Sequence, residues 1–382
     1  MASVVEETPS IMSDHVVLLS IPGLRQRDLA HMPQLGSLTS GGDCAELAPT
    51  FPGVTCCVQA NMTTGLPPRE HGVVANGFYW RDRGEVEMWT SPADCIERPQ
   101  LWDLLRRHNP ALTSAVWFPL HSTGCSADYV CTPAPIHNPD GTESLWCYTR
   151  PEAFYGELLE SLGHFPLQHF WGPMANIQGT AWIVASAIEA VRRWRPHLFY
   201  IYLPHLDYAA QKFGPDSADA IAALAELDAE IGRLADGLNA AYGDPAPLWL
   251  AAGEYAITPV EQVSYPNRAL RDAGLLQLHD TPDGRVIDYA GSAAWALVDH
   301  QLSHVFVRDR DPTVMRSAAD VLRALPGMAE VIVPGDAPQY DLAHERSGDL
   351  VAISAPNSWQ AYYWWRDDAE APPFARTVDI HR

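Results

Sequence analysis

The chain has 382 residues, of which 47% are hydrophobic, enough for a large core built as one elaborate domain or as a domain with a lid. Its formal net charge is -22. Such an acidic surface repels polyanions, which argues against nucleic-acid polymers and anionic membranes as partners. A small phosphorylated substrate stays possible, because a metal ion or a few arginines can reverse the field locally.

The cysteines and the N-terminal segment bear on the compartment. The seven cysteines are odd in number and contain no Cys-x-x-Cys pair, which is typical of free thiols in a reducing environment. The first residues, MASVVEETPSIMSDH, are acidic where a signal peptide would be basic. No apolar run approaches the roughly 20 residues that cross a bilayer. These features predict a cytoplasmic protein.

The chain opens with an α/β pattern. Residues 1–14 are expected to form a disordered leader. Residues 15–21, HVVLLSI, form a continuous apolar run before Pro22-Gly23, which is typical of a buried parallel strand that leads into a loop. Residues 24–40 carry leucines and a methionine at helical spacing and predict a helix.

Several candidate catalytic residues lie within residues 51–79, FPGVTCCVQANMTTGLPPREHGVVANGFY. Thr55 follows a Pro-Gly turn at the expected start of a helix, where unpaired backbone N–H groups attract an anion. The side-chain amide of Asn76 is able to donate to an oxyanion. On local sequence alone, a helix cap is the simpler interpretation of Thr55. Cys56 and Cys57 are alternative nucleophiles as thiolates, or small packing residues.

The middle of the chain supplies further elements and two polar strand ends. Residues 80–175 are rich in Pro, Trp and turns, and we assign no chemistry to them. Helices are expected over 177–194 and 217–241, and strands over 197–203 and 247–252. Asp207 follows the first of these strands, and Glu254-Tyr255 follow the second. The carboxyl ends of parallel strands are where open α/β sheets bind ligands, so these residues are site candidates.

Residues 258–340 change the pattern to short alternating helices and strands. Helices are expected over 267–273 and 313–325, a hairpin around Asp283-Gly284, and strands over 304–308 and 329–333. This predicts a compact α+β insertion, able to act as a lid, within an α/β domain that spans residues 15–382. His344, a strand over 350–354 and the penultimate residue His381 follow.

Several motifs together resemble the type I phosphodiesterase/nucleotide pyrophosphatase family of the alkaline phosphatase superfamily. They read Phe51-Pro52-Gly53-Val54-Thr55, Thr64-Gly65-Leu66-Pro67-Pro68, His71-Gly72 and Ala75-Asn76-Gly77-Phe78-Tyr79, in family order. The chain resembles a divergent bacterial member of this family. The resemblance implies a doubly wound, mainly parallel α/β sheet. It also implies that Thr55 is the attacking threonine and that Asn76 binds phosphate.

The family binds two zinc ions, and the first of these sites is depleted here. The aspartate that the family places after its first strand falls at Pro22, which has no ligating side chain. The family's Asp-His pair aligns with Glu254-Tyr255. Glu254 keeps a carboxylate for a metal, or acts as general base for Thr55, while Tyr255 is able to donate a proton to an anionic oxygen.

The second zinc site is only partly kept. Asp207 matches its aspartate and His381 its final histidine, but the histidine between them falls at Gln211. Zinc takes three or four ligands, so two hold it weakly. Fewer zinc ions than two, or none, are therefore expected. Histidines that are candidates for completing a site are His205, His300, His304 and His344.

The residues that we expect to meet at the carboxyl ends of the strands are Thr55, Asn76, Asp207, Glu254 and His381. They predict metal-assisted hydrolysis of a phosphate ester, phosphodiester or pyrophosphate bond in a small metabolite, by attack of a threonine. Two alternatives stay open. One is an enzyme of changed chemistry with one metal or none, in a biosynthetic pathway. The other is a binding or scaffold protein on a fold that has lost catalysis.

Overall fold

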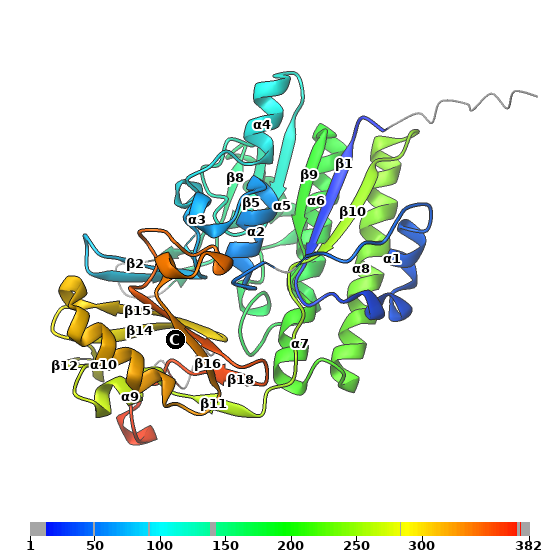
Figure 1. The fold of residues 1–382 in the computed structure, drawn as a ribbon. Helices are drawn as coiled ribbons and strands as arrows, with labels where there is room; N and C mark the ends of the chain where they lie inside the picture. Colours follow the sequence, from blue (N-terminus) through cyan, green and yellow to red (C-terminus); the bar gives the residue numbers. More distant parts are fainter. Residues whose placement is uncertain are drawn as a thin grey trace, which may run out of the picture.

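The chain folds around a six-stranded sheet (Figure 1). The structure is a computed structural model that describes residues 13–48, 50–90, 92–137, 143–282, 284–372 and 375. The strands lie in the order β10-β1-β9-β4-β5-β8, and all neighbours run parallel except β5 and β8. Their bounds are β1 (Val16–Ile21), β4 (Ser114–Trp117), β5 (Tyr129–Pro133), β8 (Cys147–Arg150), β9 (Leu198–Tyr202) and β10 (Leu248–Gly253). The predicted mainly parallel sheet is confirmed.

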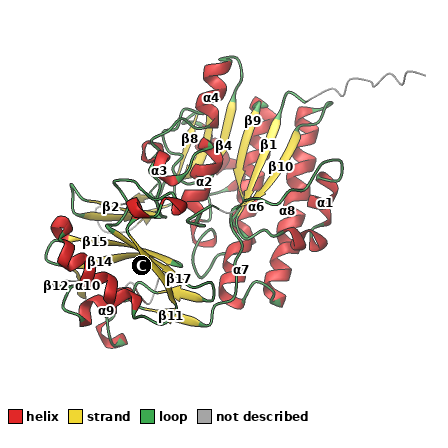
Figure 2. Ribbon diagram, viewed as in Figure 1, coloured by secondary structure: helices red, strands yellow, loops and turns green. Residues whose placement is uncertain are grey.

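Helices lie on both faces of this sheet (Figure 2), because alternate side chains of a strand point to opposite sides. On β4, Trp117 joins the core beneath α5, α6 and α8, whereas Val116 packs with Trp102 of α4. This doubly wound arrangement was predicted. The helices around the sheet are α1 (Pro33–Leu38), α2 (Thr55–Thr64), α3 (Pro68–His71), α4 (Leu101–His108), α5 (Phe154–Leu162), α6 (Ile177–Trp194), α7 (Leu206–Phe213) and α8 (Ala218–Tyr242).

The continuous helix predicted over residues 24–40 is wrong. A short 3-10 helix (Gln26–His31) is followed by α1, which starts at Pro33. Proline has no N–H to donate and fits the first position of a helix, so Pro33 separates the two elements. The carboxylate of Asp228, on α8, accepts hydrogen bonds from the backbone N–H groups of Gln34 and Leu35 at 2.9 Å each. These bonds satisfy donors that the first turn of α1 leaves unpaired.

A second, antiparallel sheet of four strands lies beside the first, in the order β14-β15-β17-β16. Helices α9 and α10 pack on one of its faces. The prediction of an insertion over residues 258–340 did not include the strand β14. It also placed the end of the insertion too early, because β17, which lies between β15 and β16 in the sheet, comes after residue 340. The bounds are α9 (Pro266–Asp272), β14 (Ala294–Asp299), β15 (Leu302–Val307), α10 (Pro312–Arg323), β16 (Met328–Ile332) and β17 (Leu350–Ser354).

Short two-stranded pairs complete the fold. The strand β11, which precedes the second sheet in the sequence, pairs in parallel with β18, which follows that sheet. The other pairs are antiparallel. Asp283, at the predicted tip of the β12–β13 hairpin, lies outside the described residues. The bounds are β2 (Gly77–Trp80), β3 (Glu85–Met88), β6 (Ile136–His137), β7 (Glu143–Ser144), β11 (Gln262–Ser264), β12 (Leu278–Thr281), β13 (Gly284–Ile287) and β18 (Ser358–Gln360).

The other face of the second sheet holds the start of α2. Leu302 and Val351 of that sheet belong to one buried cluster with Val54 and Cys57. Because Val54 and Cys57 flank the first turn of α2, burying them fixes that turn between the two sheets. The predicted nucleophile, Thr55, lies in this turn.

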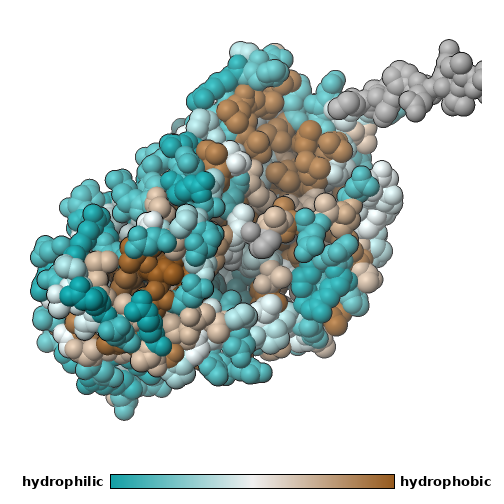
Figure 3. Space-filling model, viewed as in Figure 1, coloured by the Kyte–Doolittle hydropathy of each residue, from teal (hydrophilic) through white to brown (hydrophobic). Residues whose placement is uncertain are grey.

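The surface has an apolar region at one edge of the main sheet. Figure 3 shows apolar side chains over the near side of β1, β9 and β10, and on the edge strand β10 the side chains of Leu248 and Leu250 are 54% and 45% exposed. Within the described ranges, no helix is long and apolar enough to span a bilayer. Residues 1–12 of the expected leader, and His381, lie outside the described residues.

Substitution of Asp228 by alanine tests how α1 is held. Asp228→Ala leaves two backbone donors of α1, one of them buried, without their acceptor, and we expect the free energy of unfolding to fall by about 1–2 kcal/mol. Urea unfolding followed by circular dichroism measures this change. Asp236→Ala, at an exposed position of the same helix, is the control and should leave stability unchanged. Equal stability of the two variants would contradict this role of Asp228.

Candidate active site

Thr55 is the first residue of α2 and not its cap. The N-cap is Val54, in an extended conformation and without a side-chain cap, so the simpler interpretation of Thr55 as a capping residue is not what the structure shows. The hydroxyl Oγ1 of Thr55 instead lies 3.1 Å from the hydroxyl oxygen of Tyr255. Thr55 is 7% exposed and reaches the wall of a large cavity.

Tyr255 connects Thr55 to Asp207. Its hydroxyl donates a hydrogen bond of 3.1 Å to Oδ1 of Asp207. Since a phenol has one proton, the hydroxyl of Thr55 is the donor in the bond to Tyr255 when Tyr255 donates to Asp207. Burial, followed by the nearby carboxylates of Asp207 and Glu254, raises the pKa of Tyr255 well above its usual range. Tyr255 therefore stays protonated and acts as a donor.

Burial also raises the pKa of Asp207. Hydrogen bonds from Gln211 and Tyr255 and the charge of His300 act against this rise. Asp207 lies in the first turn of α7, which follows the end of β9. This is the strand end at which the sequence analysis predicted it. Gln211, at the position where the family has a histidine, lies one helical turn further along and faces the same cavity.

Glu254 is a buried carboxyl group held by two side chains from other elements. Its Oε1 accepts hydrogen bonds from Ser20 Oγ on β1, at 2.6 Å, and from Gln59 Nε2 on α2, at 2.9 Å. Its Oε2 is buried and has no hydrogen-bond partner in the described part of the chain. Burial raises the pKa of Glu254 to about 8, although Ser20, Gln59 and the nearby Thr55 hydroxyl lower it. A neutral carboxyl group thus lies beside the Thr55 hydroxyl at pH 7.

The loop after β1 packs against the end of β10 and the residues that follow it, next to Glu254. The backbone N–H of Gly23 donates to the carbonyl oxygen of Tyr255 at 3.0 Å. A Cβ atom at Gly253 would lie 2.6 Å from the carbonyl oxygen of Leu24, so only glycine allows this approach. Pro22 stands in the same loop. The loop where the family has a zinc-binding aspartate is therefore packed against the strand end that carries Glu254.

Asn76 lies beneath α2 and not in the cavity wall. Its Oδ1 accepts a hydrogen bond from the backbone N–H of Cys56 at 3.0 Å, and its Nδ2 donates to Oδ1 of Asp299 at 3.0 Å. Asp299 also accepts from the backbone N–H of Asn76 at 2.7 Å and lies 2.6 Å from Nδ1 of His300. Asn76, 1% exposed, thus positions the first turn of α2 and ties it to the second sheet.

A cavity of about 1120 Å³ opens beside these residues. Thr55, Asp207 and Tyr255 line one part of it. The turn between β14 and β15 of the second sheet contributes His300, and the strand β18, which pairs with β11, contributes Trp359. The wall continues over the segment after β3 and the turns between α5 and α6. The cavity is therefore bounded by both sheets, with the Thr55 hydroxyl at its surface.

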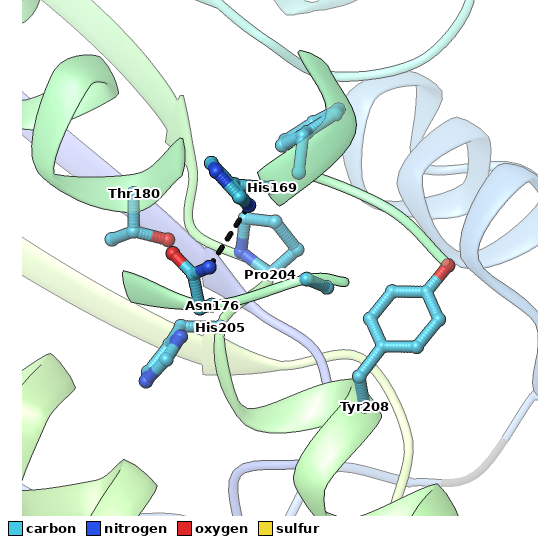
Figure 4. Close-up of a pocket in the computed structure, with 8 residues that line it drawn as sticks. His169, Asn176, Thr180, Pro204, His205 and Tyr208 are labelled. Atoms are coloured by element: carbon cyan, nitrogen blue, oxygen red, sulfur yellow. Dashed lines mark hydrogen bonds between the residues drawn. The ribbon is translucent and has the colours of Figure 1, made fainter. Parts of the chain in front are cut away.

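His205 does not reach this cavity. It lines a separate cavity of about 10 Å³, room for one water molecule, together with His169, Asn176 and Tyr208. Figure 4 shows His205 beside Asn176, with the ring of Tyr208 on the far side of Pro204. Nε2 of His205 lies 2.8 Å from a carboxylate oxygen of Glu226 on α8. The structure thus separates His205 from Asp207, although the two are close in sequence.

His304 and His344 form hydrogen bonds away from the large cavity. Nε2 of His304 lies 3.0 Å from the carbonyl oxygen of Val74, and its Nδ1 accepts from the backbone N–H of Gly348 at 3.0 Å. Nε2 of His344 lies 3.3 Å from Glu97. Neither histidine is among the described residues that line the large cavity.

The described residues do not fit the two-zinc centre of the resemblance. They contain no group of three His, Cys, Asp or Glu side chains placed to hold a metal ion. Of the candidate metal ligands, Asp207 and His300 line the cavity, Glu254 lies next to it, and His381 is outside the described residues. The protonated phenol of Tyr255 stands between Asp207 and Thr55, where it donates a hydrogen bond and does not act as an anionic ligand.

Cys56 and Cys57 are not placed as nucleophiles. Both side chains are fully buried in the cluster that holds α2 between the sheets. Burial is the main cause that raises the pKa of each thiol well above its usual range. The alternative of a reactive thiolate therefore has no support from the geometry.

The sequence analysis missed the residues that hold the site together. Ser20 and Gln59 anchor Glu254, and Asp299 anchors Asn76 and His300. Ser20 and Gln59 lie inside regular elements among apolar neighbours, and a polar residue in an apolar strand is the one signal that singles out Ser20. Asp299 ends the strand β14, which the sequence analysis missed.

Comparison with known proteins gives a family match over nearly the whole chain. Residues 16–381 match the model of the family described as type I phosphodiesterase/nucleotide pyrophosphatase. Among curated proteins, an uncharacterized pyrophosphatase/phosphodiesterase of Schizosaccharomyces pombe is 24% identical over 240 residues. That alignment covers 60% of this chain but 42% of the yeast protein, so the chain matches less than half of its relative's length.

Solved structures share the fold at low sequence identity. Phosphonoacetate hydrolase from Sinorhizobium meliloti, in complex with phosphonoformate, has a TM-score of 0.63 at 16% identity, over 94% of this chain and 84% of that one. Murine ectonucleotide pyrophosphatase/phosphodiesterase 5 has a TM-score of 0.61 at 18% identity, over 92% and 82%. The murine protein is also known as an inactive threonine-to-alanine variant in complex with AMP. At these identities the likeness concerns the fold.

The raised pKa of Glu254 predicts how stability depends on pH. Its folded pKa of about 8 lies above its ordinary value of 4.5, so the folded chain holds a proton that the unfolded chain releases between these values. Wild-type stability should therefore fall relative to Glu254→Gln as pH rises from about 5 to about 8, by at most about 1.4 kcal/mol per pH unit.

Urea unfolding of both proteins across this pH range measures the difference. Glu160→Gln, at an exposed position of α5, is the control and should follow the wild type at every pH. A constant difference in stability between Glu254→Gln and the wild type would show that Glu254 titrates normally.

Proposed function

Because the chain belongs to the type I phosphodiesterase/nucleotide pyrophosphatase family of the alkaline phosphatase superfamily, we propose that it hydrolyses a phosphodiester or related phosphate ester bond of a small molecule through attack by Thr55. Members of this family are hydrolases of such bonds. The observation that carries the proposal is the Thr55 hydroxyl at the cavity surface, between the phenol of Tyr255 and the buried carboxyl group of Glu254.

In the proposed reaction, Oγ1 of Thr55 forms a bond to phosphorus while the bond from phosphorus to the leaving oxygen breaks. Glu254 in its ionised form takes the proton of the Thr55 hydroxyl on Oε2, the oxygen with no partner among the described residues. The proton then passes to the leaving alkoxide. Attack by water on the phosphoryl-threonine regenerates Thr55. The inactive threonine-to-alanine variant of the murine relative supports a threonine in this role.

Tyr255 and Asn76 act as positioning residues in this proposal. Tyr255 holds the Thr55 hydroxyl through a bond of 3.1 Å, and its protonated phenol is able to donate to an anionic oxygen of the substrate. Asn76 fixes the backbone of the first turn of α2 through the N–H of Cys56. A fixed nucleophile reduces the entropy that must be lost on reaching the transition state.

For the metal, we propose at most one divalent ion, with Asp207 and His381 among its ligands. Asp207 is a carboxylate that lines the cavity and is joined to Thr55 through Tyr255, and the described residues lack the further ligands of a two-zinc centre. A metal of this kind supplies positive charge that offsets the charge on a phosphoryl group. Zinc is the metal that the family resemblance implies.

Two wider features of the protein are also proposed. We propose that the second sheet acts as a cover over a bound substrate, and the contribution of His300 from this sheet and of Trp359 from β18 to the cavity supports this. All seven cysteines are free, which supports a reducing, cytoplasmic location.

An enzyme of changed chemistry on the same site remains the second candidate function, and the specific observation that favours it is the phenol of Tyr255 beside Asp207.

Substitution of Thr55 tests the nucleophile. Thr55→Ala should lower the turnover of bis(para-nitrophenyl) phosphate by about a thousandfold or more, because it removes the hydroxyl group that attacks phosphorus. Thr55→Ser keeps a hydroxyl and should stay within about tenfold of the wild type. Release of para-nitrophenol measures both. Full activity of Thr55→Ala, with an unchanged circular dichroism spectrum, would exclude the mechanism.

The pH dependence of activity tests the base. Because Glu254 must be ionised to accept a proton, kcat/KM should rise with pH through about 8. Glu254→Gln should have low activity without this rise. Tyr255→Phe is the matched comparison: it loses the positioning bond and about tenfold in rate, but should keep the same rise with pH. A Glu254→Gln variant with the wild-type pH profile would rule out Glu254 as base.

Metal content tests the ligands directly. Mass spectrometry of protein purified without a histidine tag should find no more than one zinc per chain, lost in both Asp207→Ala and His381→Ala. Asp236→Ala, a carboxylate on the exposed side of α8, is the control and should keep the wild-type content. Two zinc ions per chain would contradict the single-ion proposal.

A further inference from the structure

The size of the cavity exceeds what a phosphoryl group needs. A volume of about 1120 Å³ exceeds the roughly 300–1,000 Å³ that is typical of small-molecule pockets, whereas Thr55 and Asp207 occupy one part of its wall. The remaining wall must therefore face the organic part of a substrate. Its composition indicates which chemical class that part belongs to.

The wall away from Thr55 is mainly apolar and aromatic. The rings of Trp89 and Trp171 lie with their centroids 6.5 Å apart and their planes at 34°. Leu145 and Leu167 line the same region, and Met174 lines it with 60% of its surface exposed. Aromatic and apolar side chains that are partly exposed around a cavity gain free energy when an apolar group displaces water from them.

The charges of the wall disfavour a polyanion. The described residues that line the cavity include Glu87, Asp207 and His300 but no lysine or arginine. The chain as a whole carries a net charge of -22. Proteins that bind polyphosphates surround them with arginine, lysine or metal ions. A single negative charge, placed at Thr55 near the start of α2, is the most that this wall accommodates without added cations.

We propose that the substrate is a phosphodiester with one negative charge and a bulky apolar group, and not a nucleoside polyphosphate. This inference rests on the proposed function. The phosphoryl group lies at Thr55 and the apolar group lies against Trp89 and Trp171. Thr55 Oγ1 forms the new bond to phosphorus, and the proton that it loses passes through Glu254 to the oxygen of the departing alcohol.

A series of para-nitrophenyl phosphodiesters that differ only in the second substituent tests this proposal. The substituents are methyl, naphthyl and thymidine, and ATP serves as the polyanionic comparison. We expect kcat/KM for the naphthyl ester to exceed that for the methyl ester by about tenfold or more, and ATP to be the poorest substrate. Because the leaving group is constant, the differences report binding of the second substituent.

Variants of the wall separate this inference from the proposed function. Trp171→Ala and Trp89→Ala should each lower kcat/KM for the naphthyl ester by about tenfold and leave the methyl ester unchanged. Trp146→Ala, an exposed tryptophan that is not among the lining residues, is the control and should change neither.

Each outcome has one meaning. If the methyl and naphthyl esters are cleaved equally well, or ATP is preferred, the substrate class is wrong while cleavage that needs Thr55 still supports the proposed function. If none of the esters is cleaved, the proposed function fails and this inference fails with it.

Discussion

The active site depends on the hydrogen bonds that hold a buried carboxyl group. Glu254 comes from the end of β10, Ser20 from β1 and Gln59 from α2, and Oε1 of Glu254 accepts a bond from each partner. Leaving a buried carboxylate without donors would cost more free energy than a typical hydrogen bond contributes. The two bonds thus fix α2 against the carboxyl edge of the sheet, which places Thr55 beside Glu254.

A second tie fixes the same helix from the other side. Asn76 joins the backbone of Cys56 to Asp299, which ends the first strand of the second sheet and contacts His300. The two sheets are therefore connected through the first turn of α2. Movement of the second sheet would displace this turn and the cavity wall together, so the position of Thr55 and the shape of the cavity are coupled in the fold.

The sequence predicted the parts of the fold that follow from local patterns. Apolar runs identified β1, β9 and β10, and polar residues after them identified Asp207 and Glu254. Patterns failed where a single residue overrides them, as at Pro33, where the predicted helix breaks. They also failed for β14, whose place is set by pairing with β15.

The site was harder to predict than the fold, because side-chain direction depends on tertiary contacts. His205 and Asp207 are two residues apart, yet His205 turns toward Glu226 on α8 and away from the cavity. Asn76 matches a phosphate-binding residue by motif, but its amide is engaged by Asp299. The apolar wall around Trp89 and Trp171 is formed by segments that are far apart in the sequence, so no local sequence pattern predicts it.

The most direct test of this account is the detection of a covalent intermediate on Thr55. Protein mixed with bis(para-nitrophenyl) phosphate, quenched in acid within milliseconds and digested, can be analysed by mass spectrometry for a phosphoryl adduct. The account predicts an adduct on the peptide that contains Thr55, with no such adduct in Thr55→Ala. Turnover without any adduct, or an adduct on another residue, would contradict Thr55 as the nucleophile.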